Sequence, residues 1–351
     1  MRVALVIAQF PSKEHPYIFE WVRGLIADGI DPIIITEKVS RPADSGFWKA
    51  DAEIWKRVRR INILDRPDLM LFSKSILVAF RHPGRMIQFL KTLFQTEKRK
   101  QTACRKFFEY LPLINESFDL IHFNAPQIAV RRFELSQLFQ AKSLVSFRGQ
   151  DFSFDSKKFQ PLLERADHLH FISRHLLRLA HESGYLGGKH TLIPPMVDTD
   201  FYYPKKQRSP RAVPPYILST AARLEWMKGY EFALQAVALL LEKGLSVEYY
   251  IAGEGEMREA MLYTIHQLGI QDHVHLLGWQ SPEQVRDWIR NADLYLLASV
   301  EEAFNNSVLQ AQACGLPVVC SDEGGLPENI QDGVTGRLAH CRDAWDMAKQ
   351  I

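Results

Sequence analysis

Short apolar runs alternate with segments of helical period along the whole chain of 351 residues. Runs of four to six mostly apolar residues predict buried strands, and the amphipathic segments between them predict helices. The predicted strands of the first half are 3–8, 32–36, 119–123, 143–147 and 168–172, and its predicted helices are 18–27, 132–139 and 174–183. Such alternation is typical of parallel sheets covered by helices, so the pattern predicts an α/β fold.

A second alternation follows a proline-rich and basic segment, Lys205 to Pro215, which has no apolar period and predicts a linker. Its predicted strands are 216–219, 247–252, 273–277, 294–297 and 317–320, and its predicted helices are 230–241, 256–268, 282–291 and 307–314. Since 351 residues exceed what one core usually supports, we expect two Rossmann-like domains. They are an N-terminal domain at 1–204 and a C-terminal domain at 216–351, joined by the linker 205–215.

The formal net charge of +2 gives no reason to expect a nucleic-acid partner. The basic residues are nevertheless unevenly placed, because residues 56–109 contain fourteen Lys or Arg against four Asp or Glu. The same stretch carries the apolar runs Ser75–Phe80 and Met86–Phe94. Residues 56–106 are therefore either a basic amphipathic surface that docks on an anionic membrane or a solvated helical face without a partner.

The N-terminus has one basic residue and a short apolar run that ends at Pro11, which favours a first buried strand over a signal peptide. No run reaches the roughly 18 apolar residues of a transmembrane helix. The four cysteines lack metal-site spacing, so we expect reduced thiols. These features favour a cytoplasmic protein, peripheral to the membrane if the basic surface docks there.

Three stretches of the second half follow predicted strands, where open α/β sheets bind ligands. The first, Thr220 to Gly229, contains Arg223 and Lys228. Two fixed cations there would neutralise a diphosphate, in the bound state and as charge builds on a leaving nucleotide. The alternative is a pair of solvated surface cations.

The second stretch, residues 299–319, reads as an acidic loop, a helix and a strand. Residues of helix-capping type begin the helix, whose free N–H groups favour a phosphate, and these are Asn305, Asn306 and Ser307. Glu302 before it would accept hydrogen bonds from sugar hydroxyls, and Gln310 would reach a ribose. The alternative is an ordinary capped helix.

The third stretch, Ile251 to Glu256, resembles half of a dinucleotide-binding fingerprint. The third glycine of that fingerprint is absent and Arg258 stands in its place, which disfavours a nicotinamide or flavin cofactor. The alternative is a tight turn at Gly253 that brings backbone close to a nucleotide.

In their order along the chain these stretches resemble glycosyltransferase family 4, retaining enzymes of the GT-B fold. The motifs of the C-terminal half are Ala222-Arg-Leu-x-x-x-Lys-Gly229, Ala252-Gly-x-Gly255, Leu277-Gly278, Ala313-x-Gly-x-Pro-Val-Val319, Gly324-Gly-x-x-Glu328 and Asp332-Gly-x-x-Gly336. Those of the N-terminal half are Phe10-Pro-Ser12, Asp119-Leu-Ile-His122, Phe147-Arg-Gly-Gln-Asp151, Ile172-Ser173 and Ile193-Pro-Pro-Met-Val-Asp198. The branch that the chain most resembles includes enzymes of exopolysaccharide and lipopolysaccharide assembly.

The resemblance implies that Arg223 and Lys228 bind the diphosphate and that Glu302 contacts the donor sugar. The further donor-binding residues that it implies are Gly253, Gly278, Phe304, Asn305, Asn306, Ser307 and Gln310. It implies that the domain at 1–204 binds the acceptor and that the domain at 216–351 binds the nucleotide sugar. The acceptor-side candidates of the first domain are Ser12, Asn124, Arg148 and Asp151. It also implies transfer with retention, in which the leaving phosphate helps to deprotonate the acceptor, without a protein nucleophile, a metal ion or another cofactor.

The chain departs from the family pattern at several positions. Gln310 replaces a glutamate that usually binds ribose, and Ala303 replaces a glycine, which restricts the backbone if φ is positive there. In the first domain Asn124 and Arg148 stand where many members have histidine. The sequence ends at Ile351, soon after Gly336-Arg-Leu338, whereas family members usually continue into helices that cross back onto the first domain; we expect a truncated chain or a different closure.

We therefore expect a glycosyltransferase that moves a hexose-type sugar from a nucleotide diphosphate sugar to a saccharide or lipid-linked saccharide in surface polysaccharide synthesis. A GT-B epimerase or phosphorylase is disfavoured, because no lysine-bound cofactor pattern or second carboxylate cluster is present. The alternative of another class is a catalytically weakened homologue that acts as a sugar-nucleotide sensor or assembly partner. No motif names the donor base, the sugar or the acceptor.

Overall fold

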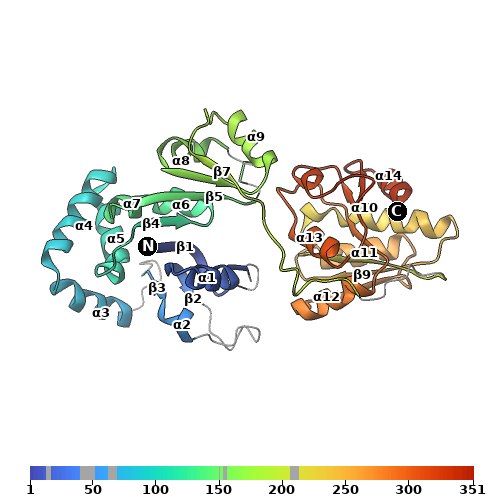
Figure 1. The fold of residues 1–351 in the computed structure, drawn as a ribbon, viewed down its shortest axis with the longest axis horizontal. Coiled ribbons are helices and arrows are strands. Elements are labelled where there is room, and N and C mark those ends of the chain that lie inside the picture. The colour runs from blue at the N-terminus through green and yellow to red at the C-terminus, as the bar shows by residue number, and fades with distance from the viewer. Residues whose placement is uncertain (13–16, 40–51, 62–68, 150, 153–155, 206–212) are drawn as a thin grey trace. The chain divides into compact units, whose positions relative to one another are not determined.

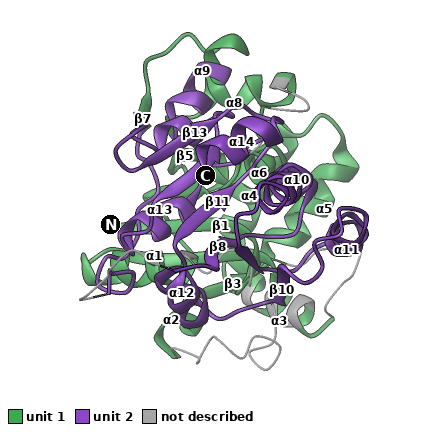
Figure 2. Ribbon diagram, turned by 90° about the vertical axis from the view of Figure 1, so that its right-hand side faces the viewer, with its two compact units in different colours: residues 1–147, 151–170, 180–191 green, residues 148–150, 171–179, 192–351 purple. Residues whose placement is uncertain are grey.

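The computed structural model describes residues 1–351 apart from 13–16, 40–51, 62–68, 150, 153–155 and 206–212. The chain forms two compact units, coloured separately in Figure 2. Unit 1 comprises residues 1–147, 151–170 and 180–191, and unit 2 comprises residues 148–150, 171–179 and 192–351. Most of the predicted linker, residues 206–212, lies outside the described residues, so the boundaries 1–204, 205–215 and 216–351 stay a prediction.

The N-terminal sheet has seven strands in the order β3-β2-β1-β4-β5-β6-β7 (Figure 1). Its strands are β1 (Arg2–Phe10), β2 (Asp31–Val39), β3 (Val58–Arg60), β4 (Leu120–Phe123), β5 (Lys142–Phe147), β6 (His168–Phe171) and β7 (His190–Leu192). Strand β1 lies parallel to both β2 and β4, and its residues 3–7 are all buried, as its apolar run predicts. The strand order reverses between β1 and β4, as in doubly wound folds.

Helices of the N-terminal half connect these strands. They are α1 (Tyr17–Ala27), α2 (Ala52–Lys56), α3 (Leu69–Phe80), α4 (Pro83–Thr96), α5 (Lys100–Tyr110), α6 (Pro126–Arg132), α7 (Glu134–Leu138), α8 (Gln160–Arg165) and α9 (Arg174–Glu182). The inner face of α1 packs Phe19 and Val22 against Leu5 of β1, in one apolar core. Burial of these side chains is the main term that holds helix and sheet together.

The C-terminal sheet has six strands in the order β10-β9-β8-β11-β12-β13, and it reverses between β8 and β11. Its strands are β8 (Tyr216–Ala221), β9 (Val247–Ala252), β10 (Val274–Gly278), β11 (Leu294–Leu297), β12 (Val318–Ser321) and β13 (Gly336–Ala339). Each pair of neighbours in this sheet is parallel. The sheet is thus a second doubly wound, Rossmann-like sheet.

Two layers of helices cover the C-terminal sheet. The helices are α10 (Tyr230–Glu242), α11 (Arg258–Gln267), α12 (Pro282–Asn291), α13 (Asn306–Ala313) and α14 (Ala344–Gln350). One core contains side chains of α10, α11 and α14, and the other contains side chains of α12 and α13. Strand β11 contributes to both, because Leu296 faces the first core whereas Tyr295 and Leu297 face the second.

The predicted elements agree well with the structure, and the predicted α/β fold with two Rossmann-like sheets is confirmed. One prediction was wrong in detail: the helix expected over 132–139 is the shorter helix α7, Glu134–Leu138, and Arg132 is the last residue of a separate helix, α6. The apolar Phe133 between them continues the helical period, so the sequence pattern does not show the break. The short edge strands β3, β7 and β13 were not predicted, since their sequences VRR, HTL and GRLA contain no apolar run.

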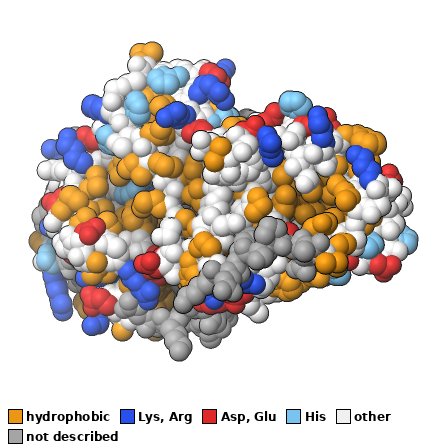
Figure 3. All heavy atoms as spheres, turned by 45° about the vertical axis from the view of Figure 1, so that its right-hand side comes forward, with side chains coloured by type: hydrophobic (Ala, Val, Ile, Leu, Met, Phe, Trp, Pro, Cys, Tyr) orange, Lys and Arg blue, Asp and Glu red, His pale blue; other side chains and the backbone are white. Residues whose placement is uncertain are grey.

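The exposed surface carries charges of both signs. On the face shown in Figure 3, Lys and Arg side chains alternate with Asp and Glu side chains around groups of hydrophobic ones, in keeping with the net charge of +2. All four cysteines lie in the described part of the chain, and none forms a disulfide. Among the described residues, no helix has both the length and the apolar character needed to span a membrane.

Candidate active site

The candidate site lies where the strand order of the C-terminal sheet reverses. Strands β8 and β11 are parallel neighbours there. The strand that follows β8 in the chain, β9, lies on one side of this pair, and the strand that follows β11, β12, lies on the other side. Open α/β sheets bind ligands beyond the carboxyl ends of the strands at such a point. The loop after β8 contains Arg223 and Lys228, and the loop after β11 contains Glu302. The fold therefore brings together two loops that lie about 75 residues apart in sequence.

The loop after β8 is held by close backbone contacts at glycines of the neighbouring loop. A Cβ atom at Gly253 would lie 1.9 Å from the carbonyl oxygen of Ala222, and one at Gly255 would lie 2.3 Å from that of Leu224. Neither contact is possible for a larger residue without a backbone shift. Gly278 supports the same turn, because its carbonyl accepts a hydrogen bond of 2.8 Å from the Gly253 N–H. The structure thus gives these predicted donor-binding glycines a packing role.

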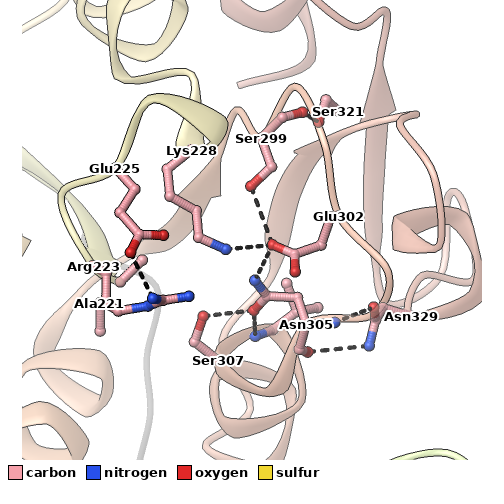
Figure 4. A network of polar contacts seen from close by, with 12 residues as sticks. Ala221, Arg223, Glu225, Lys228, Ser299, Glu302, Asn305, Ser307, Ser321 and Asn329 are labelled. Atoms are coloured by element: carbon pink, nitrogen blue, oxygen red, sulfur yellow. Dashed lines mark hydrogen bonds and ion pairs between the residues drawn. The ribbon is translucent and has the colours of Figure 1, made fainter. Parts of the chain in front are cut away.

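The two predicted cations are both paired with carboxylates. Figure 4 shows the Lys228 ammonium directed at the Glu302 carboxylate, whereas the Arg223 guanidinium is bonded to Glu225. Both N···O distances are 2.5 Å. The side chain of Lys228 is only 9% exposed, whereas that of Arg223 is 53% exposed. The prediction of two cations was therefore incomplete, because each cation has a carboxylate partner. The two ion pairs together carry no net charge.

Glu302 is the centre of the polar network. Its Oε2 atom accepts hydrogen bonds from Lys228, from Asn305 Nδ2 at 2.9 Å and, at the limit of hydrogen bonding, from Ser299 at 3.5 Å. Its Oε1 atom accepts no hydrogen bond from any described residue. A carboxylate held on one oxygen and open on the other is suited to accept hydrogen bonds from a sugar.

Backbone conformation at the acidic loop does not conflict with Ala303. The concern that alanine would be strained there does not apply, because the φ angle of Ala303 is not positive. The loop is instead packed against two glycines of the Gly324-Gly325 motif. A Cβ atom at Gly325 would lie 1.8 Å from the carbonyl oxygen of Ala303, and one at Gly324 would lie 2.1 Å from that of Glu302. These glycines allow the acidic loop to reach its place beside Lys228.

The start of α13 is capped by Asn305, as predicted from its residue type. The Asn305 side chain accepts a hydrogen bond of 3.1 Å from the Val308 N–H. Asn306 is the first helical residue and is exposed, and Phe304 is half-buried before the cap. Gln310 is half-buried one turn after Ser307, on the same side of the helix. Among the described residues, the Gln310 amide has no hydrogen-bond partner.

Several polar residues of the network were not predicted from the sequence. Asn329 holds the backbone of Asn305 from both sides, since it accepts from the Asn305 N–H at 3.1 Å and donates to the Asn305 carbonyl at 3.2 Å. Tyr295 links the Ala221 backbone to Ser307. The position of Asn329, directly after the Gly324-Gly-x-x-Glu328 motif, was a signal that could have revealed it. Tyr295 gave no such signal, because it lies in an apolar strand.

The acceptor-side candidates follow three neighbouring strands of the N-terminal sheet. Ser12 comes after β1, Asn124 directly after β4, and Arg148 directly after β5. Asn124 and Asp151 are buried, and Asp151 accepts a hydrogen bond of 2.7 Å from the side chain of Gln127. Ser12, Asn124 and Asp151 belong to unit 1, whereas Arg148 belongs to unit 2. Their role in binding an acceptor stays a prediction.

Comparison with known proteins agrees with this description. Residues 204–351 match the family model described as "Glycosyl transferases group 1". One relative is the amylovoran biosynthesis glycosyltransferase AmsK of Erwinia amylovora, 33% identical over 140 residues, which are 38% of this chain and 34% of AmsK. Another is the D-inositol 3-phosphate glycosyltransferase of Mycolicibacterium smegmatis, 33% identical over 166 residues, which are 46% of this chain and 38% of the relative. The matches thus span little more than a third of these relatives.

Solved structures extend the likeness in fold to the whole chain. HepE of Anabaena, in complex with UDP and glucose, has a TM-score of 0.71 at 16% identity and covers 99% of this chain and 88% of its own. Sucrose-phosphate synthase of Thermosynechococcus elongatus has a TM-score of 0.74 at 19% identity, with 100% and 88% covered. The two Rossmann-like sheets therefore define a GT-B fold. In sequence, the likeness to the glycosyl transferases group 1 family covers residues 204–351.

Proposed function

We propose that this chain transfers a hexose-type sugar from a nucleotide diphosphate sugar to a saccharide or lipid-linked saccharide, with retention of the anomeric configuration, in surface polysaccharide synthesis. The observation that carries the proposal is the Lys228–Glu302 pair at the switch point of the C-terminal sheet. It puts a cation for the diphosphate and a carboxylate for sugar hydroxyls 2.5 Å apart. The exposed Arg223 on the same loop supplies a second cation.

The reaction needs charge stabilisation more than a protein nucleophile. The bond between the anomeric carbon and the phosphate oxygen breaks, and a bond to the acceptor oxygen forms on the same face. The acceptor proton passes to the leaving phosphate. Lys228 and Arg223 stabilise the charge that develops on that phosphate, and the Arg223 guanidinium has further N–H donors beside the one bonded to Glu225. The Glu302 carboxylate, held by donors on Oε2, orients the sugar through Oε1.

The named relatives support the choice of substrates. AmsK is a glycosyltransferase of amylovoran biosynthesis, and HepE was solved with UDP and glucose. A further neighbour in fold, the lipopolysaccharide outer core galactosyltransferase WaaB, has a TM-score of 0.64 at 17% identity and covers 100% of this chain and 89% of its own. These proteins act on or bind sugars or sugar nucleotides, and they favour a saccharide acceptor for this chain.

A panel of UDP-, GDP-, ADP- and dTDP-sugars tests the proposal. The correct donor should raise the melting temperature through binding linkage, and the protein should release the nucleoside diphosphate when an acceptor is present. Stabilisation without release would favour the alternative, a homologue that senses sugar nucleotides. No stabilisation by any member of the panel would contradict the proposal.

We also propose that the transfer needs no metal ion, because Arg223 and Lys228 take the role that a divalent cation has in other phosphate-transferring sites. Among the described residues, no group of three His, Cys, Asp or Glu side chains is placed to hold a metal. Activity should therefore be unchanged in EDTA. A loss of activity that manganese or magnesium restores would contradict this part of the proposal.

A second proposal concerns the surface of α3 and α4, which we propose docks on an anionic membrane. Ile87, Lys91 and Phe94 share one face of α4, and Ile87 and Phe94 are 67% and 44% exposed. Phe80 at the end of α3 is 72% exposed. Exposed apolar side chains beside a cation are the pattern of helices that lie in a membrane interface.

The charge on this surface is smaller than the sequence count suggests. Arg59 is paired with Glu116, and Lys106 with Glu97 and Glu134. Arg57 and Arg105 likewise have carboxylate partners. The exposed cations of residues 56–106 that form no ion pair with any described residue are Lys56, Arg81, Arg85, Lys91, Lys98, Arg99 and Lys100. These seven remain to attract an anionic surface, at about 1 kcal/mol each near the membrane.

Co-sedimentation with vesicles tests the second proposal. The protein should bind vesicles that contain phosphatidylglycerol and not vesicles of phosphatidylcholine alone, and binding should weaken as salt rises. Ile87→Asp and Phe94→Asp should each reduce binding. The control is Tyr263→Asp on α11, because Tyr263 is 67% exposed but lies on unit 2. Equal binding to both kinds of vesicle would contradict a docking role for this surface.

A further inference from the structure

A buried tyrosine links the two loops of the candidate site. Tyr295 on β11 has no exposed surface, and its hydroxyl lies between the last residue of β8 and the start of α13. The Ala221 N–H donates to the Tyr295 oxygen at 3.1 Å. The same oxygen lies 2.7 Å from Ser307 Oγ. Because Ala221 is followed directly by the loop of Arg223 and Lys228, this hydroxyl touches the base of the cationic loop.

The hydrogen bonds continue from Ser307 to Glu302. Ser307 Oγ lies 2.6 Å from Asn305 Oδ1, and Asn305 Nδ2 lies 2.9 Å from Glu302 Oε2. Figure 4 shows Ser307, Asn305 and Glu302 in this order, with Lys228 bonded to the same carboxylate oxygen as Asn305. An uninterrupted chain of hydrogen bonds therefore runs from Ala221 to Lys228. These two residues lie at opposite ends of the loop after β8, so the chain links the two ends of that loop.

The direction of the hydrogen bonds from Ser307 to Glu302 is fixed. Asn305 Oδ1 accepts from the Val308 N–H, so the amide orientation is set and Nδ2 faces Glu302. A carbonyl oxygen only accepts, so the Ser307 hydroxyl donates to Asn305. Tyr295 therefore donates in its 2.7 Å contact with Ser307, although its hydroxyl also lies 3.1 Å from the Ala221 carbonyl oxygen, a second acceptor at a longer distance. With this donor from Tyr295, the donors of the chain point towards the Glu302 carboxylate, an arrangement in which each bond strengthens the next.

We infer that Tyr295 and Ser307 are positioning residues, which fix the Asn305 amide against Glu302 and hold the acidic loop beside the cationic loop. The inference rests on the proposed function, because it concerns the same donor site. Tyr295 donates throughout the physiological range, since burial raises its pKa to about 12. Its hydroxyl therefore stays neutral and keeps the single proton that the chain requires.

The chain offers a matched control in Tyr249. This residue is a second fully buried tyrosine of the same sheet, and its hydroxyl lies 2.7 Å from Thr220 Oγ1, one residue before Ala221. Thr220 also donates to the Leu296 carbonyl, so these bonds do not lead to Glu302. Tyr249→Phe removes a buried hydroxyl of the same type at a similar place. The two variants differ only in whether the lost oxygen belongs to the chain that reaches Glu302.

The first test is donor turnover in two backgrounds. Tyr295→Phe and Ser307→Ala should each lower kcat/KM for the sugar nucleotide about tenfold, and Tyr249→Phe should leave it within about twofold. In a Glu302→Ala background the Tyr295→Phe change should have no further effect, because the residue through which it acts is gone. A purely structural role would lower turnover in both backgrounds alike and would overturn the inference.

The second test needs no turnover. In urea denaturation, Tyr295→Phe and Ser307→Ala should be non-additive, because both break one chain, whereas Tyr249→Phe and Ser307→Ala should be additive. Additive effects for the first pair would overturn the inference. If the wild-type protein turns over no sugar nucleotide, the proposed function is overturned instead. The urea denaturation of the single and double variants would then still decide whether the Tyr295 and Ser307 hydroxyls act together.

Discussion

The two sheets share a strand order but differ in where their polar side chains lie. Both reverse between the first strand of the sheet and its neighbour across the switch point, at β1 and β4 in one case and at β8 and β11 in the other. In unit 2 the network around Glu302 lies in loops beyond the strand ends, while Thr220 and Tyr249 bond one another inside the sheet. In unit 1 a polar ladder lies inside the sheet, where Ser146 is 2.7 Å from His122 and 2.9 Å from His170.

This difference fits the proposed function of unit 2. A diphosphate and a sugar would need donors and acceptors fixed in advance, and the loops of unit 2 are tied to one another and to glycines. The row of hydrogen-bonded side chains in unit 1 ends one residue before the strands do, since His122, Ser146 and His170 each precede the last residue of their strand. It joins three strands through the core.

The largest expected effect comes from a methyl group at a motif glycine in a loop beside each sheet. Gly325→Ala should lower the free energy of unfolding by about 3 kcal/mol and should abolish donor binding, because the new Cβ would lie 1.8 Å from the Ala303 carbonyl oxygen. Gly149→Ala, in the loop that follows β5 of the N-terminal sheet and is counted with unit 2, should change the free energy of unfolding by less than about 0.5 kcal/mol, since no atom of a described residue lies within 4 Å of its Cβ position. Urea denaturation measures both.

Two outcomes would contradict the expected difference between the two glycine variants. If Gly149→Ala destabilises the protein as much as Gly325→Ala, the loop after β5 is as tightly packed as the acidic loop. The contrast between the two regions would then be wrong. If Gly325→Ala retains donor binding, the glycine is not what allows the acidic loop to approach Lys228.

The next largest effect is expected from replacing the two cations, which should lower activity in both cases but stability in only one. Arg223→Ala and Lys228→Ala should each reduce transfer about a hundredfold, since loss of one charge contact costs about 3 kcal/mol in the transition state. Only Lys228→Ala should also destabilise the fold, by about 3 kcal/mol, because it leaves the carboxylate of Glu302 without its cation. Steady-state kinetics and thermal denaturation of the same samples measure the two effects.

Two further variants control this prediction. Arg258→Ala removes an exposed cation of the same unit, on α11, and should leave both transfer and stability unchanged. The double variant Lys228→Ala with Glu302→Gln should regain stability but not activity, because it removes the unpaired charge without restoring the contact. Wild-type transfer in either Arg223→Ala or Lys228→Ala would contradict the assignment of these cations to the donor.

Much of the fold was readable from the sequence, for identifiable reasons. The predicted helix 282–291 matches α12 exactly in extent, because Ser281 and Gln284 form a capping box and Pro282 opens the helix. The strands 247–252 and 294–297 agree with β9 and β11 because they are apolar and bounded by turns. What the pattern lacked was any sign of the edge strands β3, β7 and β13, which are fixed by pairing with a neighbour, whereas the edge strand β10 was predicted at 273–277.

The candidate site was readable only in part. Residue type and position led to Lys228, Glu302 and Asn305, which the structure joins by hydrogen bonds. The pairing of Arg223 with Glu225 was missed, although the two lie only two residues apart, because a loop has no fixed period that places side chains together. Tyr295 was missed because its neighbours are apolar and its hydroxyl acquires partners only when β8 and β11 pair. Contacts across strands need the fold before they can be seen.

The smallest expected effect concerns Gln310, which stands where the family it resembles has a ribose-binding glutamate. The side chain lies on the same side of α13 as Ser307 and has no hydrogen-bond partner among the described residues, so its amide is available to a ligand. Gln310→Glu should tighten donor binding several-fold, because a hydrogen bond to a charged acceptor contributes about 1 kcal/mol more than a neutral one. Gln310→Ala should weaken binding by a similar factor. Isothermal titration of the three proteins with the best sugar nucleotide measures both changes, and identical dissociation constants would mean that Gln310 does not contact the donor and that the loops of unit 2 bind it without this helix turn.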